Sequence, residues 1–391
     1  MITQTIALFV DAYRELNAKK LFWITMLLSG LVVLIYAAIG INEEGITFLW
    51  FKLGFIPVTS EQMPPAMLYK LLFINLGIGI WLTWIAAVLA LISTAGIIPE
   101  MISGGSIEML LSKPISRTRL FFTKYATGLL FAALQVAVFT AASFLVIGIR
   151  GGAWEPSLFL AVPLVVCFFS YLFAFCVLVG VLTRSTIASL LLTLLFWFGL
   201  FVVNTGDNAL MMFKTQFEAQ RDGYQTSIDS SRQAAAKILT ARRADSENPL
   251  PEGYVATDDD IRTVSPWMGR VFENRDEAIE GIRKIEPWAK GVYVAKTALP
   301  KTQETVALLE RWLISLADLD ALSSRMSDED DEPTPTLEEN EGELRLEDSE
   351  VSRRVQEKIR NRSAWWVLGT SLLFEFFFVS FAAFLFSRRD H

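Results

Sequence analysis

The sequence predicts an all-α integral membrane protein with six transmembrane helices, an N-terminal interfacial helix, and a helical extracytoplasmic insertion between spans five and six. Apolar residues make up 52% of the chain and charged residues only 20%, and the mean hydropathy is +0.40, a balance typical of proteins that lie in lipid. The apolar residues are concentrated in six runs, each long enough to cross a hydrocarbon core, which takes about 20 helical residues. These runs are Leu21–Asn42, Leu71–Pro99, Tyr125–Ile149, Pro156–Thr183, Ser185–Gly206 and Ser363–Ser387.

The first run is interpreted as a retained span. A cleaved secretory signal is the other interpretation, but 20 mostly polar residues precede this run, and it is longer than the apolar region of a typical signal peptide. Within residues 1–20, apolar side chains recur at steps of four and three, so they share one helix face. This pattern predicts an interfacial helix along the inner leaflet, although a partner-binding helix would have the same pattern. The apolar residues are Ile2, Ile6, Phe9, Tyr13 and Leu16.

Positive charges predict the orientation of the spans. With a cytoplasmic N-terminus, the short outer segments hold Lys52, Lys70 and Arg150, whereas the short inner segments hold ten basic residues. The ten are Arg14, Lys19, Lys20, Lys113, Arg117, Arg119, Lys124, Arg184, Arg388 and Arg389. This bias predicts a multi-pass protein with both termini on the cytoplasmic side of the plasma membrane, because the opposite orientation would place the ten outside.

Residues 207–362 form one long excursion, which holds 32 of the 42 acidic and 22 of the 35 basic residues. The composition predicts a solvated helical domain, and its basic residues do not contradict the orientation because long loops translocate largely regardless of charge. Asn208–Arg243 is expected to continue span five outward as a helix. Asp276–Lys290 and Thr302–Met326 are further predicted helices, and Val351–Asn361 is expected to run straight into span six.

The segment 327–350 is acidic, contains two prolines and has few apolar residues, so it cannot bury enough surface to offset the entropy of ordering. We predict that it is disordered; a Ca²⁺ site is the alternative, but the spacing lacks the glycine of an EF-hand loop. The expected organisation is an interfacial helix at 1–20, spans one to five at 21–206 with an inner loop at 98–118, the insertion at 207–362, and span six with a cytoplasmic tail at 363–391.

Side chains that carry common catalytic chemistry are scarce. The single histidine is His391, the last residue, and both cysteines, Cys167 and Cys176, lie in the fourth run. Histidine acid–base chemistry, a clustered histidine metal site and a disulfide framework are therefore not expected. The phosphate-binding sequence Gly-x-x-x-x-Gly-Lys-(Ser/Thr) also does not occur. We expect no enzyme activity, metal or cofactor in this chain, so that any ATP that drives it is bound by a partner.

The inner loop between spans two and three contains a short amphipathic helix between two breakers. Ile107, Leu110 and Leu111 lie on one face, Gly104-Gly105 precedes the helix, and Pro114 ends it. Ser116 is a predicted N-cap for the next helix, which carries Arg117, Arg119 and Lys124 to the membrane. A helix that presents apolar residues on an inner loop is suited to docking in a groove of another protein.

This loop resembles the loop after the second span of ABC-2-type exporter permeases. The matching residues are Glu100, Gly105, Ser106, Ile107, Glu108, Leu110, Leu111, Ser112, Lys113, Pro114, Ser116, Arg117 and Lys124. The resemblance covers Met1–Asn204 and Ser363–His391, whereas the long insertion departs from the family pattern. It implies that the loop is a coupling helix that contacts a cytoplasmic ATPase subunit through Glu100, Gly105, Ile107, Glu108, Leu110, Leu111, Lys113, Pro114 and Arg117.

The favoured function is the permease subunit of an ATP-driven exporter of unknown substrate, working as a homodimer or with a second permease. Membrane lipid is an expected partner and nucleic acid is not. The competing hypothesis is a membrane-anchored assembly or signalling protein whose insertion carries the function, and a membrane enzyme is third.

Glu375, near the middle of run six, is the one ionisable residue deep within a span. A functional role is the default for such a residue. The alternative is a packing role, with the carboxyl facing Gln135 or Asn75 of neighbouring spans. Trp and Tyr residues near the span ends are expected to be interface anchors; they include Trp23, Trp81, Trp365 and Trp366.

Overall fold

The computed structural model describes residues 20–52, 58–103, 116–244, 250–251, 253–315, 318, 321 and 348–388. Six helices in these residues are long and apolar enough to cross a membrane, which confirms the predicted fold class. The chain divides into two compact units, called here the membrane unit and the insertion unit. The membrane unit is Met1–Val202, Lys296–Asp328 and Ser363–His391, and the insertion unit is Val203–Ala295 and Glu329–Arg362. Residues 1–19 of the predicted interfacial helix lie outside the described residues, as do residues 327–347 of the predicted acidic segment.

Span one, α2 (Lys20–Ala38), leads directly into a three-stranded antiparallel sheet that the sequence did not predict. Its strands are β1 (Ile39–Asn42), β2 (Gly45–Phe48) and β3 (Phe51–Lys52). The run of apolar residues was expected to stay helical to Asn42. Instead the polar turn after β1 reverses the chain at Gly45, whose φ of 122° is readily adopted only by glycine.

Span two is built from three helical segments, and its middle is a π-helix. The segments are α3 (Pro65–Leu72), the π-helix η1 (Phe73–Ala86) and α4 (Ala87–Thr94), and a turn then leads to α5 (Ile97–Ser103). Within η1 the Thr83 hydroxyl donates to the carbonyl of Ile78, five residues earlier, at 2.7 Å. Trp81 was expected at the membrane interface, but it is buried and its Nε1 donates to Ser29 Oγ at 3.0 Å.

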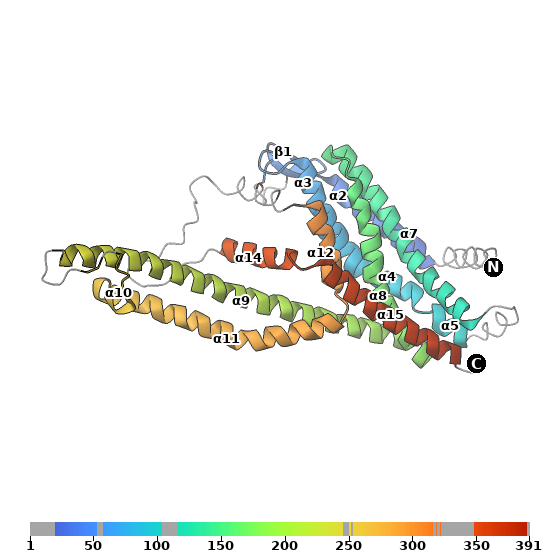
Figure 1. The fold of residues 1–391 in the computed structure, drawn as a ribbon. Coiled ribbons are helices and arrows are strands. Elements are labelled where there is room, and N and C mark those ends of the chain that lie inside the picture. Colours follow the sequence, from blue (N-terminus) through green and yellow to red (C-terminus); the bar gives the residue numbers. More distant parts are fainter. Residues whose placement is uncertain are drawn as a thin grey trace. The chain divides into compact units, whose positions relative to one another are not determined.

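Spans three and four form the centre of the membrane unit. Span three is α7 (Arg117–Gly151); as predicted, Ser116 is its N-cap, with the hydroxyl accepting from the Arg119 amide at 3.4 Å. A short 3₁₀ helix, η2 (Pro156–Leu160), precedes span four, α8 (Ala161–Thr183). Most residues of α8 are buried, and it packs against α7 and α15 (Figure 1).

Span five continues without a break as α9 (Thr186–Arg243), which confirms the helix predicted to extend outward from it. Span six is α15 (Ala364–Arg388), and the preceding helix is α14 (Asp348–Arg360). The prediction that this helix runs straight into span six is wrong, because residues 361–363 are not helical. The backbone carbonyl of Ser363 accepts the first hydrogen bond of span six, from the Val367 amide at 3.1 Å.

The predicted helix at Thr302–Met326 appears as α12 (Thr302–Leu313) and packs in the membrane unit, although it was expected in the insertion. Its neighbours are α8, α15, η1 and η2 (Figure 1). Leu308, Leu309 and Leu313 are buried there, so the apolar face of this helix packs against the spans.

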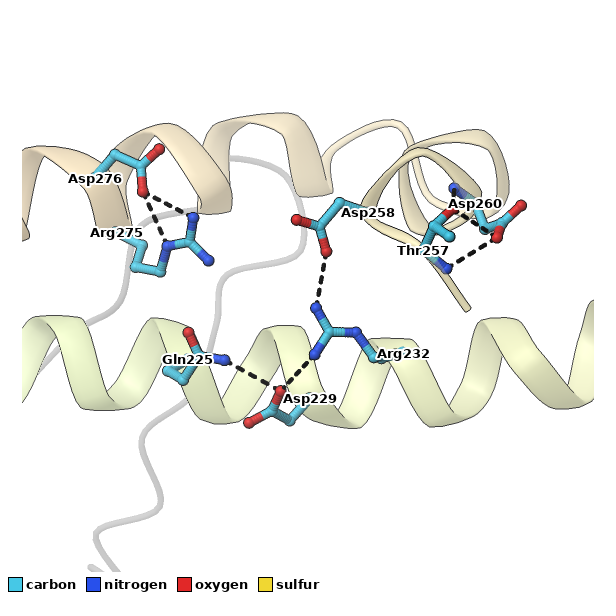
Figure 2. Close-up of polar contacts among 8 residues, drawn as sticks. All are labelled: Gln225, Asp229, Arg232, Thr257, Asp258, Asp260, Arg275 and Asp276. Atoms are coloured by element: carbon cyan, nitrogen blue, oxygen red, sulfur yellow. Dashed lines mark hydrogen bonds and ion pairs between the residues drawn. The ribbon is translucent and has the colours of Figure 1, made fainter. Parts of the chain in front are cut away.

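The insertion unit has a small apolar core between α9, α10 (Asp258–Val264) and α11 (Met268–Ala298). Ile228, Ile261, Met268 and Val271 are completely buried. At the edge of this core Arg232 of α9 bridges Asp229, at 3.1 Å, and Asp258 of α10, at 2.8 Å (Figure 2).

Ion pairs join α14 to the part of α9 in the insertion unit. The basic partners are Arg354 and Lys358, which lie four residues apart on one face of α14, and Arg362, which follows the end of this helix. The pairs are Arg362–Asp207 at 2.7 Å, Lys358–Glu218, and Arg354–Asp222 at 3.3 Å. The first pair is also the most buried, with side chains 12% and 8% exposed.

Asp260 stabilises the N-terminus of α10 as part of a capping box, and this stabilisation depends on pH. Its carboxylate accepts hydrogen bonds from Tyr254 and from the side chain and amide of Thr257 (Figure 2), which lower the pKa of Asp260 to about 2. Because this pKa is lowered, the hydrogen bonds of Asp260 stabilise the folded state at pH values above its ordinary pKa of 3.8. This stabilisation is lost as the pH falls towards 2. Hydrogen exchange of α10 amides is therefore expected to accelerate between pH 4 and 2 beyond its intrinsic pH dependence. A Thr257→Ala variant should show a smaller acid-induced loss of protection.

Candidate functional site

The predicted coupling loop is held at both ends by helices of the membrane unit. On one side α5 packs against α7 and α8, with Ile98 and Met101 buried and Glu100 exposed. The contact is close: a Cβ added at Gly180 of α8 would lie 3.0 Å from Pro99 Cγ. Glu100 therefore projects from a fixed helix at one end of the loop.

On the other side, Arg117 is the first residue of α7, after the Ser116 cap. The structure thus gives the two flanks of the loop, but residues 104–115 lie outside the described residues. The predicted site residues in that segment are Gly105, Ile107, Glu108, Leu110, Leu111, Lys113 and Pro114.

Glu375 joins three spans inside the membrane unit. Its two carboxylate oxygens accept from Tyr125 Oη of α7, at 2.9 Å, and from Ser170 Oγ of α8, at 2.6 Å. The Tyr125 ring stacks on Phe173 with centroids 5.2 Å apart, and a Cβ added at Gly128 would lie 2.4 Å from the Phe173 ring. The absence of a side chain at Gly128 therefore permits the packing that places Tyr125 beside Glu375.

The expectation that Glu375 faces Gln135 or Asn75 is corrected by this geometry. Asn75 lies at the surface of η1 and donates to the Leu71 carbonyl of its own span at 3.0 Å. Gln135 is buried, with 3% of its surface exposed, and its Nε2 has no hydrogen-bond partner among the described residues. Sequence patterns give no direct sign of the pairing with Tyr125, which is 250 residues away in the chain.

Charged side chains at the turn between α11 and α12 form a second polar cluster, which the sequence did not reveal. Lys296 pairs with Glu304, and the two side chains are only 5% and 6% exposed. Lys301, 1% exposed, donates through Nζ to Thr370 Oγ1 at 2.5 Å and lies 4.3 Å from the Trp366 ring centroid. Its backbone amide donates to Ser371 Oγ of α15 at 2.9 Å. These contacts fix the start of α12 to span six.

The available signal for this cluster was indirect. Lys296, Lys301 and Glu304 lie in residues 207–362, for which the sequence predicts a solvated helical domain. The signal that could have revealed the cluster is the apolar face of the following helix, α12, because such a face indicates packing against other elements.

Comparison with known proteins is consistent with this architecture. Residues 15–200 match the family model described as ABC-2 family transporter protein. No curated protein and no solved structure matches the chain. The matched region runs from before span one into span five, and it includes the loop flanked by α5 and α7. Residues 15–200, just under half of the chain, are therefore similar to ABC-2 family transporter proteins, in a protein whose described residues include six helices long and apolar enough to cross a membrane.

Proposed function

We propose that this chain is the transport permease of an ATP-driven exporter, and that a separate cytoplasmic ATPase drives it through the inner loop at 98–118. The observation that carries the proposal is the way this loop is attached. α5, which bears Glu100, is packed on spans three and four, and Ser116 caps the start of span three. A force applied to a docking helix between these two flanks would act directly on three spans.

The charge bias supports a cytoplasmic location for this loop. Arg117, Arg119 and Lys124 lie in the first turns of α7, and Arg184 lies in the short link between α8 and α9, on the same side of the membrane by helix count. In the proposed orientation both termini are cytoplasmic and the insertion unit is outside. Two permease subunits, identical or different, would pair with two ATPase subunits.

A second candidate function is favoured by the insertion unit, which has an apolar core of its own. Such a unit could be the working part of a membrane-anchored assembly or signalling protein. Replacing Asn208–Asn361 with a short linker distinguishes the two. If the shortened protein still binds and stimulates the ATPase and keeps its phenotype in the cell, the permease proposal is supported. If it binds and stimulates the ATPase but loses the phenotype, the insertion unit carries the function.

The direct test of the permease proposal is disruption of the docking helix. Glu108→Arg reverses a charge and Leu111→Asp puts a charge on the apolar face, so each should reduce the ATPase that copurifies with the tagged protein by at least about tenfold, the equivalent of 1.4 kcal/mol. The measurement is quantitative mass spectrometry of the complex purified in mild detergent. Folding is checked by an unchanged gel-filtration profile.

The matched control is Glu44→Arg, the same charge reversal in the exposed turn between β1 and β2. In the proposed orientation this turn lies on the opposite side of the membrane, so ATPase recovery should not change. Full ATPase recovery with both loop variants would show that the loop is not the docking site.

A further inference from the structure

The small sheet after span one has two turns at opposite ends. Hydrogen bonds show how far each turn lies along the sheet from the end of α2. The Leu49 amide donates to the carbonyl of Ala38, the last residue of α2, at 2.7 Å, and Phe48 pairs with Ile39. The turn at Leu49–Trp50 therefore lies level with the end of the transmembrane helix. The turn after Asn42 lies three strand residues farther along, or about 10 Å.

The two turns differ in chemistry. At the near turn Leu49, Trp50 and Phe51 are 52%, 88% and 72% exposed. At the far turn the chain carries Glu43 and Glu44, both exposed. The sheet is thus apolar at the end that meets the helix terminus and acidic at the end farthest from it.

The end of span one also carries exposed apolar side chains. One helical turn before α2 ends, Leu34 and Ile35 are 67% and 42% exposed. Trp and other aromatic residues are enriched where the hydrocarbon core meets the headgroups, because their rings accept an environment apolar on one side and polar on the other.

The sheet is also held in one orientation relative to the spans. Tyr69 Oη of α3 donates to the Ile39 carbonyl at 2.6 Å, and Arg150 Nε of α7 donates to Tyr69 Oη at 3.1 Å. On the sheet itself Ile46 is buried against Leu68 of α3. The apolar turn therefore cannot turn away from the level of the helix end without breaking these contacts.

We propose that the turn Leu49–Phe51 is a membrane anchor that inserts into the interfacial layer of the leaflet where span one ends. The partner is the lipid surface, with Trp50 and Phe51 below the headgroups and the acidic turn in water. The anchor would set the depth of span one. This inference depends only on span one crossing the bilayer, and not on the proposed transport function.

Spin labels on the full-length protein in phospholipid vesicles test the proposal. Single cysteines replace Trp50, Glu44 or Leu34 in a background with Cys167→Ala and Cys176→Ala. Collision of each label with oxygen, which is concentrated in lipid, is compared with collision with a water-soluble nickel chelate. The expected oxygen-to-nickel ratio at position 50 is several-fold above that at position 44 and approaches that of the lipid-facing position 34.

Two results would overturn the anchor. A ratio at position 50 equal to that at 44 would place the turn in water, and a label shielded from both reagents would show that a second copy or another protein covers it. If the cysteine background does not fold, Trp50→Phe in the native chain replaces it. This variant should lower the fluorescence quenching by lipids brominated near the headgroup, whereas Trp288→Phe in the insertion unit should not, and equal quenching with and without Trp50 would contradict the proposal.

Discussion

Replacing Lys296 with Met is expected to destabilise the membrane unit by about 3–5 kcal/mol, because it removes a cation that is paired with the buried carboxylate of Glu304. The two side chains are 5% and 6% exposed, so water cannot replace the lost partner. The effect should appear as a large fall in the thermal unfolding midpoint of the purified protein, measured by intrinsic fluorescence.

The double variant Lys296→Met/Glu304→Met separates loss of charge pairing from loss of packing. Because a buried ion pair is often replaced by apolar residues of similar volume at little cost, the second substitution should recover most of the stability. Lys52→Met is the control, since it breaks the exposed Glu44–Lys52 pair, at 3.7 Å with side chains 76% and 55% exposed, and should have little effect. A double variant no more stable than Lys296→Met would contradict the account of this pair.

Gly128→Ala is expected to destabilise the protein by about 1–3 kcal/mol, although alanine is the better helix former. The added Cβ would lie 2.4 Å from the ring of Phe173, which is fully buried and stacked on Tyr125 and Phe169 with centroids 5.2 and 5.6 Å away. Moving this ring disturbs Tyr125 and with it a hydrogen bond to Glu375. The thermal unfolding midpoint again reports the loss.

The same substitution at Gly30 of span one is the matched control, because no atom lies within 4 Å of a Cβ built there. Gly30→Ala should be neutral or stabilising, since it removes a glycine from a helix interior. If both alanine variants are equally stable, the close approach at Gly128 does not constrain the packing of spans three and four.

The spans, their helical continuation through α9 and the Ser116 cap were predictable because each depends on local sequence. Twenty apolar residues in lipid can satisfy their backbone only as a helix, and a serine before a charged helix start is a local capping signal. The family resemblance rested on the same kind of short-range pattern.

The partners of Glu375 and the position of α12 were not predictable, because they depend on contacts between residues far apart in the chain. Tyr125 and Ser170 had no signature beyond lying in spans. Lys301 and Glu304 lie in the stretch predicted to be a solvated domain, but the helix that begins there packs Leu308 and Leu309 into the core of the membrane unit.

The π-helix makes span two shorter than an α-helix with the same number of residues would be, so a change of helix type would lengthen this span. An i→i+5 helix is wider and rises less per residue than an α-helix, so the 14 residues of η1 would occupy a longer stretch of the membrane if their hydrogen bonds shifted to i→i+4. Such a shift would push α4 and α5 along the axis of the span relative to α3 and rotate their side chains about it. A movement of α5, which bears Glu100 beside the inner loop, would thus be transmitted along span two by a change in its helical pitch. This transmission needs neither a hinge nor a break in the backbone hydrogen bonds.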